Sequence, residues 1–150
     1  MQIVLPPDIR RKLKMWLRRA GRKEIGGIIM AEQLEPGNFI VRDLSLDDAT
    51  GSEAHFVRSP ERHAAALQEF FDRTGSDYAR FNYLGEWHSH PNFDVNPSPV
   101  DIVSMNDLVT GERDIQFAAL LIVRLRYLLW LELTASAFVR GRPAVVAHVQ

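Results

Sequence analysis

A chain of 150 residues, 46% of them hydrophobic, can bury the core of one ordinary domain, and we expect a single domain over residues 1–150. Its 18 basic and 19 acidic residues nearly cancel, so the net charge gives no sign of a nucleic-acid or membrane partner, and we expect a protein partner. The sequence has no cysteine, which excludes disulfides, thiolate metal sites and cysteine nucleophiles.

The N-terminal part predicts a short strand over residues 2–5 and, after two prolines, an amphipathic helix. Apolar residues recur along this helix at Ile9, Leu13, Trp16, Leu17 and Ala20. Its opposite face is basic, and we interpret it as a solvated helix face rather than a nucleic-acid patch. The first residues lack the basic-then-apolar order of a signal peptide, so we expect a cytoplasmic protein.

Two apolar segments, at residues 24–32 and 39–46, flank turn residues at 35–38 and predict a hairpin whose first strand begins at Glu24. Residues 47–53 predict a loop, followed by a short strand around 55–58. Ser59 and Pro60 begin a second helix that ends at Gly75, and His63 in this helix is expected to face solvent. Its apolar stripe consists of Ala64, Leu67, Phe70 and Phe71.

The second half predicts a strand over residues 83–90, then a loop, then a helix that buries Val100, Val103 and Leu108. After a loop at 110–113, strands are expected at 115–123, 126–134 and 143–148. The apolar tract that contains the first two is interrupted by charged residues, so we interpret it as buried strands rather than a membrane span. The order of elements predicts an α/β fold with a mixed sheet flanked by helices.

The segment from Glu86 to Asp101, EWHSHPNFDVNPSPVD, contains a possible metal site. His88 and His90 are two residues apart on a predicted strand, so both side chains project from the same face. Ser98 and Pro99 then predict a helix start, which places Asp101 in the first turn, facing back toward the strand end. Two imidazoles and one carboxylate leave the fourth position of a catalytic zinc site for water.

Each part of this pattern also has a simpler interpretation. A His-x-His sequence is often incidental, and the residues from Ser98 to Asp101 equally fit a capping box, in which the acidic side chain bonds back to the cap amide. The combined spacing favours the metal site. The other histidines, His55, His63 and His148, lie outside the pattern and receive no role.

The pattern resembles the JAMM motif of the JAB/MPN metalloprotease family, which reads H-[ST]-H, seven residues, S, two residues and D. The match is complete. The family also carries a catalytic glutamate upstream, followed by a glycine and an apolar run, and the segment EIGGIIM from Glu24 fits that description. The resemblance implies a JAB fold, in which helices flank a mixed, mostly antiparallel sheet in α/β/α layers like those of cytidine deaminases.

The resemblance also implies roles for these residues. His88, His90 and Asp101 would bind one Zn²⁺ per chain, which activates water and polarises the scissile carbonyl. Glu24 would transfer protons, and Ser98 would hydrogen-bond the developing oxyanion. Glu86 competes with Glu24 because it shares the face of His88, where it could serve as a base, as a hydrogen-bond partner of the ligands or as a solvated strand residue. Relatives commonly carry an aromatic residue at this place, so the sequence departs here from the family pattern.

Relatives that keep these residues cleave peptide or isopeptide bonds after the C-terminus of ubiquitin-like proteins. A compact chain of this kind resembles bacterial stand-alone JAB peptidases, including those encoded beside ubiquitin-like conjugation enzymes in anti-phage operons. We therefore expect a ubiquitin-like partner and its conjugates. The alternatives are a peptidase for a sulfur-carrier protein in cysteine or cofactor metabolism, and a non-catalytic scaffold.

Overall fold

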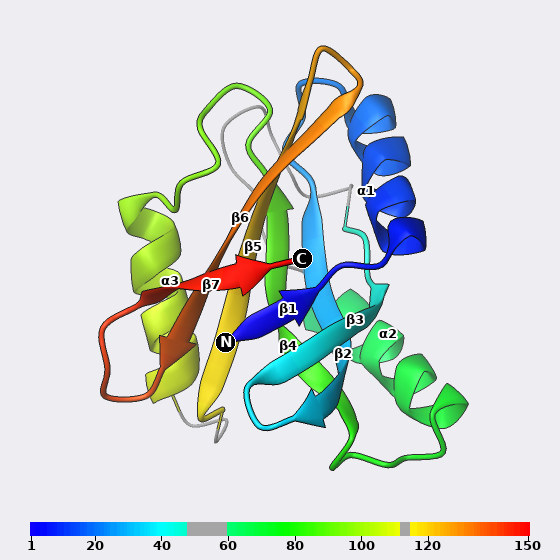
Figure 1. Cartoon of the computed structure of the whole chain (residues 1–150), viewed down its shortest axis with the longest axis vertical. Helices are drawn as coiled ribbons and strands as arrows, with labels where there is room; N and C mark the ends of the chain where they lie inside the picture. Colours follow the sequence, from blue (N-terminus) through cyan, green and yellow to red (C-terminus); the bar gives the residue numbers. More distant parts are fainter. Residues whose placement is uncertain (48–59, 112–114) are drawn as a thin grey trace.

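The computed structural model describes residues 1–47, 60–111 and 115–150 (Figure 1). The elements in these residues are β1 (Gln2–Val4), α1 (Pro7–Ala20), β2 (Gly26–Glu35), β3 (Asn38–Leu44), α2 (Pro60–Arg73), β4 (Phe81–Ser89), α3 (Pro99–Thr110), β5 (Phe117–Arg126), β6 (Trp130–Val139) and β7 (Val145–Val149). The α/β prediction is thus confirmed. The expected strand at 55–58, and all of the expected loop at 47–53 except its first residue, lie outside the described residues.

The sheet closes on itself, which corrects the expectation of open layers. Its strands follow the order β1-β3-β2-β4-β5-β6-β7, and β1 pairs in parallel with both β3 and β7. The pair of β4 and β5 is also parallel, whereas the remaining neighbours are antiparallel. The three residues of β1 join β3 to β7 and so close the sheet. Closure gives hydrogen-bond partners to strands that would otherwise have exposed edges.

Helices cover both faces of the central strands (Figure 1). The helical stripe Ile9, Leu13 and Leu17 of α1 is buried in the main core, where Trp16 stacks on Trp87 of β4 with ring centroids 5.7 Å apart. On the other face, α3 covers apolar residues of β5, and Phe70 of α2 packs with apolar residues of β2. The side chains of β4 that point away from α1 therefore lie between α2 and α3.

The buried face of α3 differs from the prediction. Val100 and Val103 are 62% and 59% exposed, whereas Met105 and Val109 are buried. The inward stripe begins with Asp101 and continues at Met105, Leu108 and Val109, so the first turn of the helix presents a carboxylate to the sheet in place of the two valines expected there. The prediction for Leu108, which is partly buried, is confirmed. Because the apolar residues of α3 are spread around the helix rather than gathered on one side, hydrophobicity alone did not identify this face.

Two further expectations were wrong. His63 is half-buried rather than solvent-facing, with its Nδ1 3.5 Å from the hydroxyl of Ser45. The turn between β5 and β6 lies at residues 127–129, several residues later than expected. This turn is built from apolar residues, of which Tyr127 and Leu128 have positive φ angles of 50° and 59°, so it carries none of the usual turn residues.

Candidate metal centre

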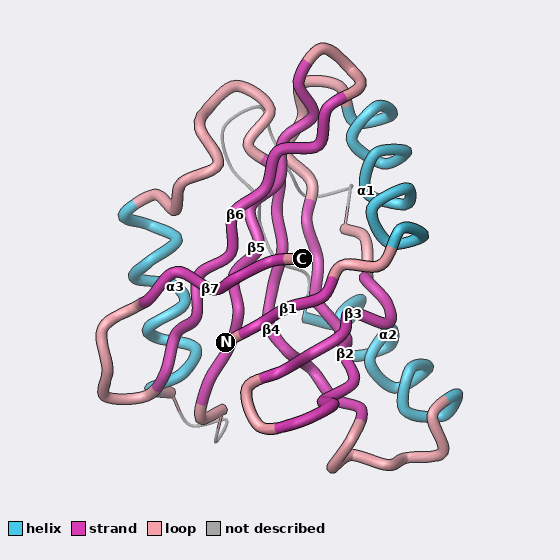
Figure 2. The backbone as a smooth tube through the Cα atoms, in the orientation of Figure 1, coloured by secondary structure: helices cyan, strands magenta, loops and turns pink. Residues whose placement is uncertain are grey.

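Two elements bring the candidate ligands together. His88 lies near the end of β4 and His90 just after it, while Asp101 lies in the first turn of α3. Figure 2 shows the loop of residues 90–98 that returns the chain from the strand end to the start of this helix. Ser89 between the histidines points away, and its hydroxyl accepts a hydrogen bond from the amide of Ile25 at 3.0 Å. The alternation expected along the strand is thus present.

The three candidate ligand side chains form a compact triangle. The Nε2 atoms of His88 and His90 are 3.0 Å apart, and they lie 3.4 and 3.7 Å from Oδ1 and Oδ2 of Asp101, respectively. Tetrahedral ligands about 2.0–2.1 Å from a zinc ion lie roughly 3.3–3.4 Å from one another. The distance between the two Nε2 atoms and the distance from Nε2 of His88 to Oδ1 of Asp101 are close to this spacing, whereas His90 lies nearest the other carboxylate oxygen. Among the described residues, these three side chains form a group that could hold one metal ion.

The capping box and the candidate ligand are the same residues. The backbone amide and the hydroxyl of Ser98 both donate to Oδ2 of Asp101 at 2.7 Å, and the hydroxyl accepts from the amide of Asp101 at 3.2 Å. These bonds hold the carboxylate so that Oδ1 faces His88. The two interpretations of this segment are therefore compatible.

The electrostatics of the site keep this carboxylate ionised. Burial acts to raise the pKa of the Asp101 carboxyl, but the hydrogen bond and charge of His88 and the hydrogen bonds from Ser98 outweigh burial. The pKa of Asp101 is consequently held well below its usual value. An ionised carboxylate beside two imidazoles is the donor set that divalent transition metals prefer.

The orientation of His90 depends on a loop that the sequence did not indicate. Nδ1 of His90 lies 2.8 Å from the carbonyl oxygen of Asp94, an arrangement that directs Nε2 toward the other ligands. Arg124 of β5 holds this loop by donating to the carbonyl of Phe93 at 2.8 Å, and Thr134 of β6 donates to the carbonyl of Val95. These supporting residues come from distant strands, so no local spacing in the sequence identifies them.

The two candidate acidic residues occupy different positions. Glu24 is 6% exposed and precedes β2, which begins two residues later than predicted. Gly26 pairs with His88, and Ile25 exchanges hydrogen bonds with Ser89, so Glu24 lies one residue beyond these contacts, near the end of β4 whose ligand face carries His88. Glu86, on the same face, lies farther down β4 and lines a cavity between α2 and α3.

Comparison with known proteins identifies the family. Residues 6–135 match the family described as prokaryotic homologues of the JAB domain. The chain belongs to this family. The resemblance inferred from the motif is thus confirmed, and the match covers every candidate site residue of this JAB homologue, from Glu24 to Asp101.

Solved structures similar to this JAB homologue share its fold. A Desulfitobacterium hafniense protein, solved in solution, has a TM-score of 0.72, is 18% identical, and aligns over 99% of this chain and 91% of its own. A Salinibacter ruber protein has a TM-score of 0.57 and 22% identity, over 88% of this chain and 79% of its own. The search of curated proteins found no match. Among the described residues, no helix is long and apolar enough to cross a membrane.

Proposed function

We propose that this protein is a zinc-dependent peptidase that cleaves after the C-terminus of a ubiquitin-like protein, either by removing it from a target or by trimming its precursor, in a bacterial conjugation pathway. The proposal rests on the close grouping of His88, His90 and Asp101, which are the three ligands expected of a catalytic zinc site and the group among the described residues that could hold a metal ion. A structural zinc site would use its fourth position for another protein ligand.

The residues around this triangle suit hydrolysis. When bound, Zn²⁺ would polarise a substrate carbonyl and lower the pKa of water. Glu24, which is buried just before β2, is the group that would accept a proton from the attacking water and deliver it to the leaving amine. Ser98 would support the oxyanion by turning its hydroxyl from Asp101, to which it donates in this structure, toward the substrate oxygen.

One cavity lined by described residues suits an extended substrate tail. It has a volume of about 1180 Å³ and lies between α2 and α3, with Tyr83 and Glu86 of β4 among its lining residues. Because β4 is hydrogen-bonded to β2 and β5 on its two sides, a tail cannot add a strand beside it. We therefore propose that the tail lies across this groove and that the globular part of the substrate adds the remaining affinity.

The test combines metal analysis with cleavage of a panel of ubiquitin-like and sulfur-carrier fusion proteins. The native protein should hold about one zinc per chain and cut a fusion after its last modifier residue, but should react slowly with the isolated tail peptide. Glu24→Gln should keep zinc and fold and lose cleavage, whereas Glu86→Gln, the matched control, should remain active.

Each part of the proposal has an outcome that contradicts it. Stoichiometric zinc in a His88→Ala, His90→Ala double variant would reject the proposed coordination. Cleavage of sulfur-carrier fusions alone would assign the protein to the alternative pathway, and a zinc-loaded protein that cleaves nothing in the panel would favour a scaffold. An active Glu24→Gln variant would transfer the proton-transfer role to Glu86.

A further inference from the structure

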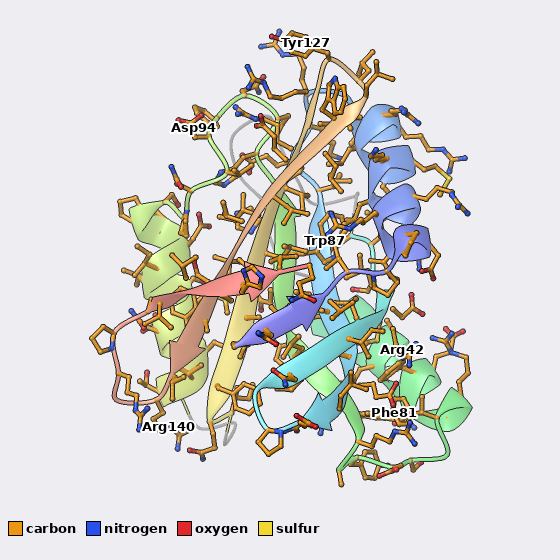
Figure 3. All side chains as sticks on the ribbon, viewed as in Figure 1. Arg42, Phe81, Trp87, Asp94, Tyr127 and Arg140 are labelled. Carbon is orange, nitrogen blue, oxygen red and sulfur yellow. The ribbon has the colours of Figure 1, made fainter. Side chains whose placement is uncertain are left out.

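The hairpin of β5 and β6 ends in a run of exposed apolar residues. Tyr127, Leu128, Leu129 and Trp130, here called the apolar tip, are 78%, 63%, 60% and 69% exposed. The hairpin extends to one end of the molecule, and Figure 3 shows Tyr127 at its extremity. Single exposed apolar residues are common on proteins, but four in succession at a projecting turn indicate an interaction surface for a protein, a membrane or a ligand.

The fold does not require these side chains. None of the four belongs to the hydrophobic clusters formed by the described residues. Two of them, Tyr127 and Leu128, have backbone angles in the left-handed region, where asparagine or glycine would be less strained. The chain therefore places bulky apolar residues where both solubility and backbone conformation disfavour them.

Basic side chains lie beside the apolar tip. Arg18, near the end of α1, donates to the carbonyl of Leu128 at 3.0 Å, which fixes this end of the helix against the turn. Arg18 and Arg19 in the last turn of α1 and Arg22 just after it are here called the basic collar. All three are exposed, and none forms an ion pair within the described parts of the chain. Residues 1–23 contain eight basic residues and one acidic residue, so the nearly neutral chain has a strongly cationic segment.

We propose that this end of the molecule docks on the surface of an anionic lipid bilayer. Tyrosine and tryptophan favour the headgroup region, leucine favours the acyl boundary, and arginine pairs with lipid phosphates. A convex apolar tip with a cationic collar matches that layered chemistry. Two copies of this chain would instead bring two basic collars together, and a nucleic acid would leave the apolar tip uncovered.

This inference revises the expectation drawn from the net charge. A net charge near zero describes the whole chain, whereas binding to a lipid surface depends on the charges within about one Debye length of it. The inference is also independent of the proposed peptidase activity, because neither the apolar tip nor the basic collar contains a candidate metal ligand or acid-base residue.

The experiment measures flotation of the purified full-length protein with phosphatidylcholine vesicles, with and without about 30 mol% phosphatidylglycerol. We expect binding to anionic vesicles at least tenfold stronger than to neutral ones, and weaker binding as salt increases. A tip variant, Leu128→Asn with Trp130→Thr, and a collar variant, Arg19→Gln with Arg22→Gln, should each lose at least tenfold in binding. Arg18 stays unchanged because it supports the turn.

A matched control and a spectroscopic readout complete the test. Val145→Thr with Val146→Thr removes exposed apolar residues from β7 and should leave binding within about twofold. Binding should shift the tryptophan emission to the blue, and Trp130→Phe should abolish this shift, because Trp87 is fully buried and stacked on Trp16.

Several results would overturn the inference. One is failure of the folded native protein to bind anionic vesicles. Another is an equal loss of binding in the β7 control. Self-association that the tip variant abolishes, in a protein that does not bind vesicles, would assign the surface to a second copy. The collar variant does not alter the turn, so it keeps the test valid even if the tip variant fails to fold.

Discussion

The first prediction concerns Ser98, whose hydroxyl serves both the helix and the candidate metal ligand. Ser98→Ala removes the bond that the hydroxyl accepts from the amide of Asp101 and the bond that it donates to Oδ2. Loss of the cap should lower the free energy of unfolding by about 1 kcal/mol. Loss of a hydrogen bond to a charged group is worth about 1.5–3 kcal/mol, so zinc affinity should fall roughly tenfold to a hundredfold.

The assay separates these effects. Thermal unfolding of the metal-free protein reports the cap, and competition with a chromophoric chelator reports zinc affinity. Ser98→Thr keeps a hydroxyl and should restore most of both quantities. Turnover measured at saturating zinc then isolates the contact with the oxyanion, for which we expect a loss of roughly tenfold to a thousandfold. Native zinc affinity in a destabilised Ser98→Ala protein would refute the shared role of the carboxylate.

Three further predictions follow from contacts elsewhere in the fold. Arg124→Met should weaken zinc binding roughly tenfold, because it releases the loop that orients His90. Arg126→Met removes a basic residue of the same hairpin that makes no hydrogen bond to that loop within the described residues, so zinc affinity should stay unchanged. Equal losses of zinc affinity in the two variants would contradict the argument. Gly85→Ala should destabilise the protein by about 2 kcal/mol or more, measured by denaturant unfolding, because its new Cβ would lie 1.9 Å from the carbonyl oxygen of Ala119. An unchanged denaturation midpoint would show that β4 and β5 can move apart at this position. Adding a chelator to the zinc-loaded protein should lower its Tm, with full recovery on adding zinc, since the metal binds the folded state; an unchanged Tm would mean that the site contributes nothing to stability.

That the three candidate ligands lie close together could be predicted from the sequence, because their geometry is local. His88 and His90 are separated by one strand period, and the helix start at Ser98 determines the direction of Asp101, so short-range rules cover the whole triangle. The supporting contact of Arg124 follows no such rule. It depends on how a hairpin more than 30 residues away meets the loop.

The difference between local rules and long-range contacts also explains the errors in the fold prediction. The inward face of α3 was misassigned because the exposed Val100 and Val103 are as apolar as the buried Met105 and Val109, and only the packed sheet distinguishes them. The turn after β5 was misplaced because Tyr127 and Leu128 adopt left-handed angles that their residue types do not suggest. Closure of the barrel could not be predicted, because it rests on pairing between the first and last strands.

That pairing has a consequence for how the chain folds. Gln2 of β1 is paired with His148 of β7, so the contact that closes the sheet joins residues at opposite ends of the sequence. During synthesis β1 can pair with β3 early, but its other side stays open until residues 145–149 have left the ribosome. A contact of such long sequence separation forms slowly, and until then the nascent sheet exposes two edges that a chaperone or a neighbouring chain can bind.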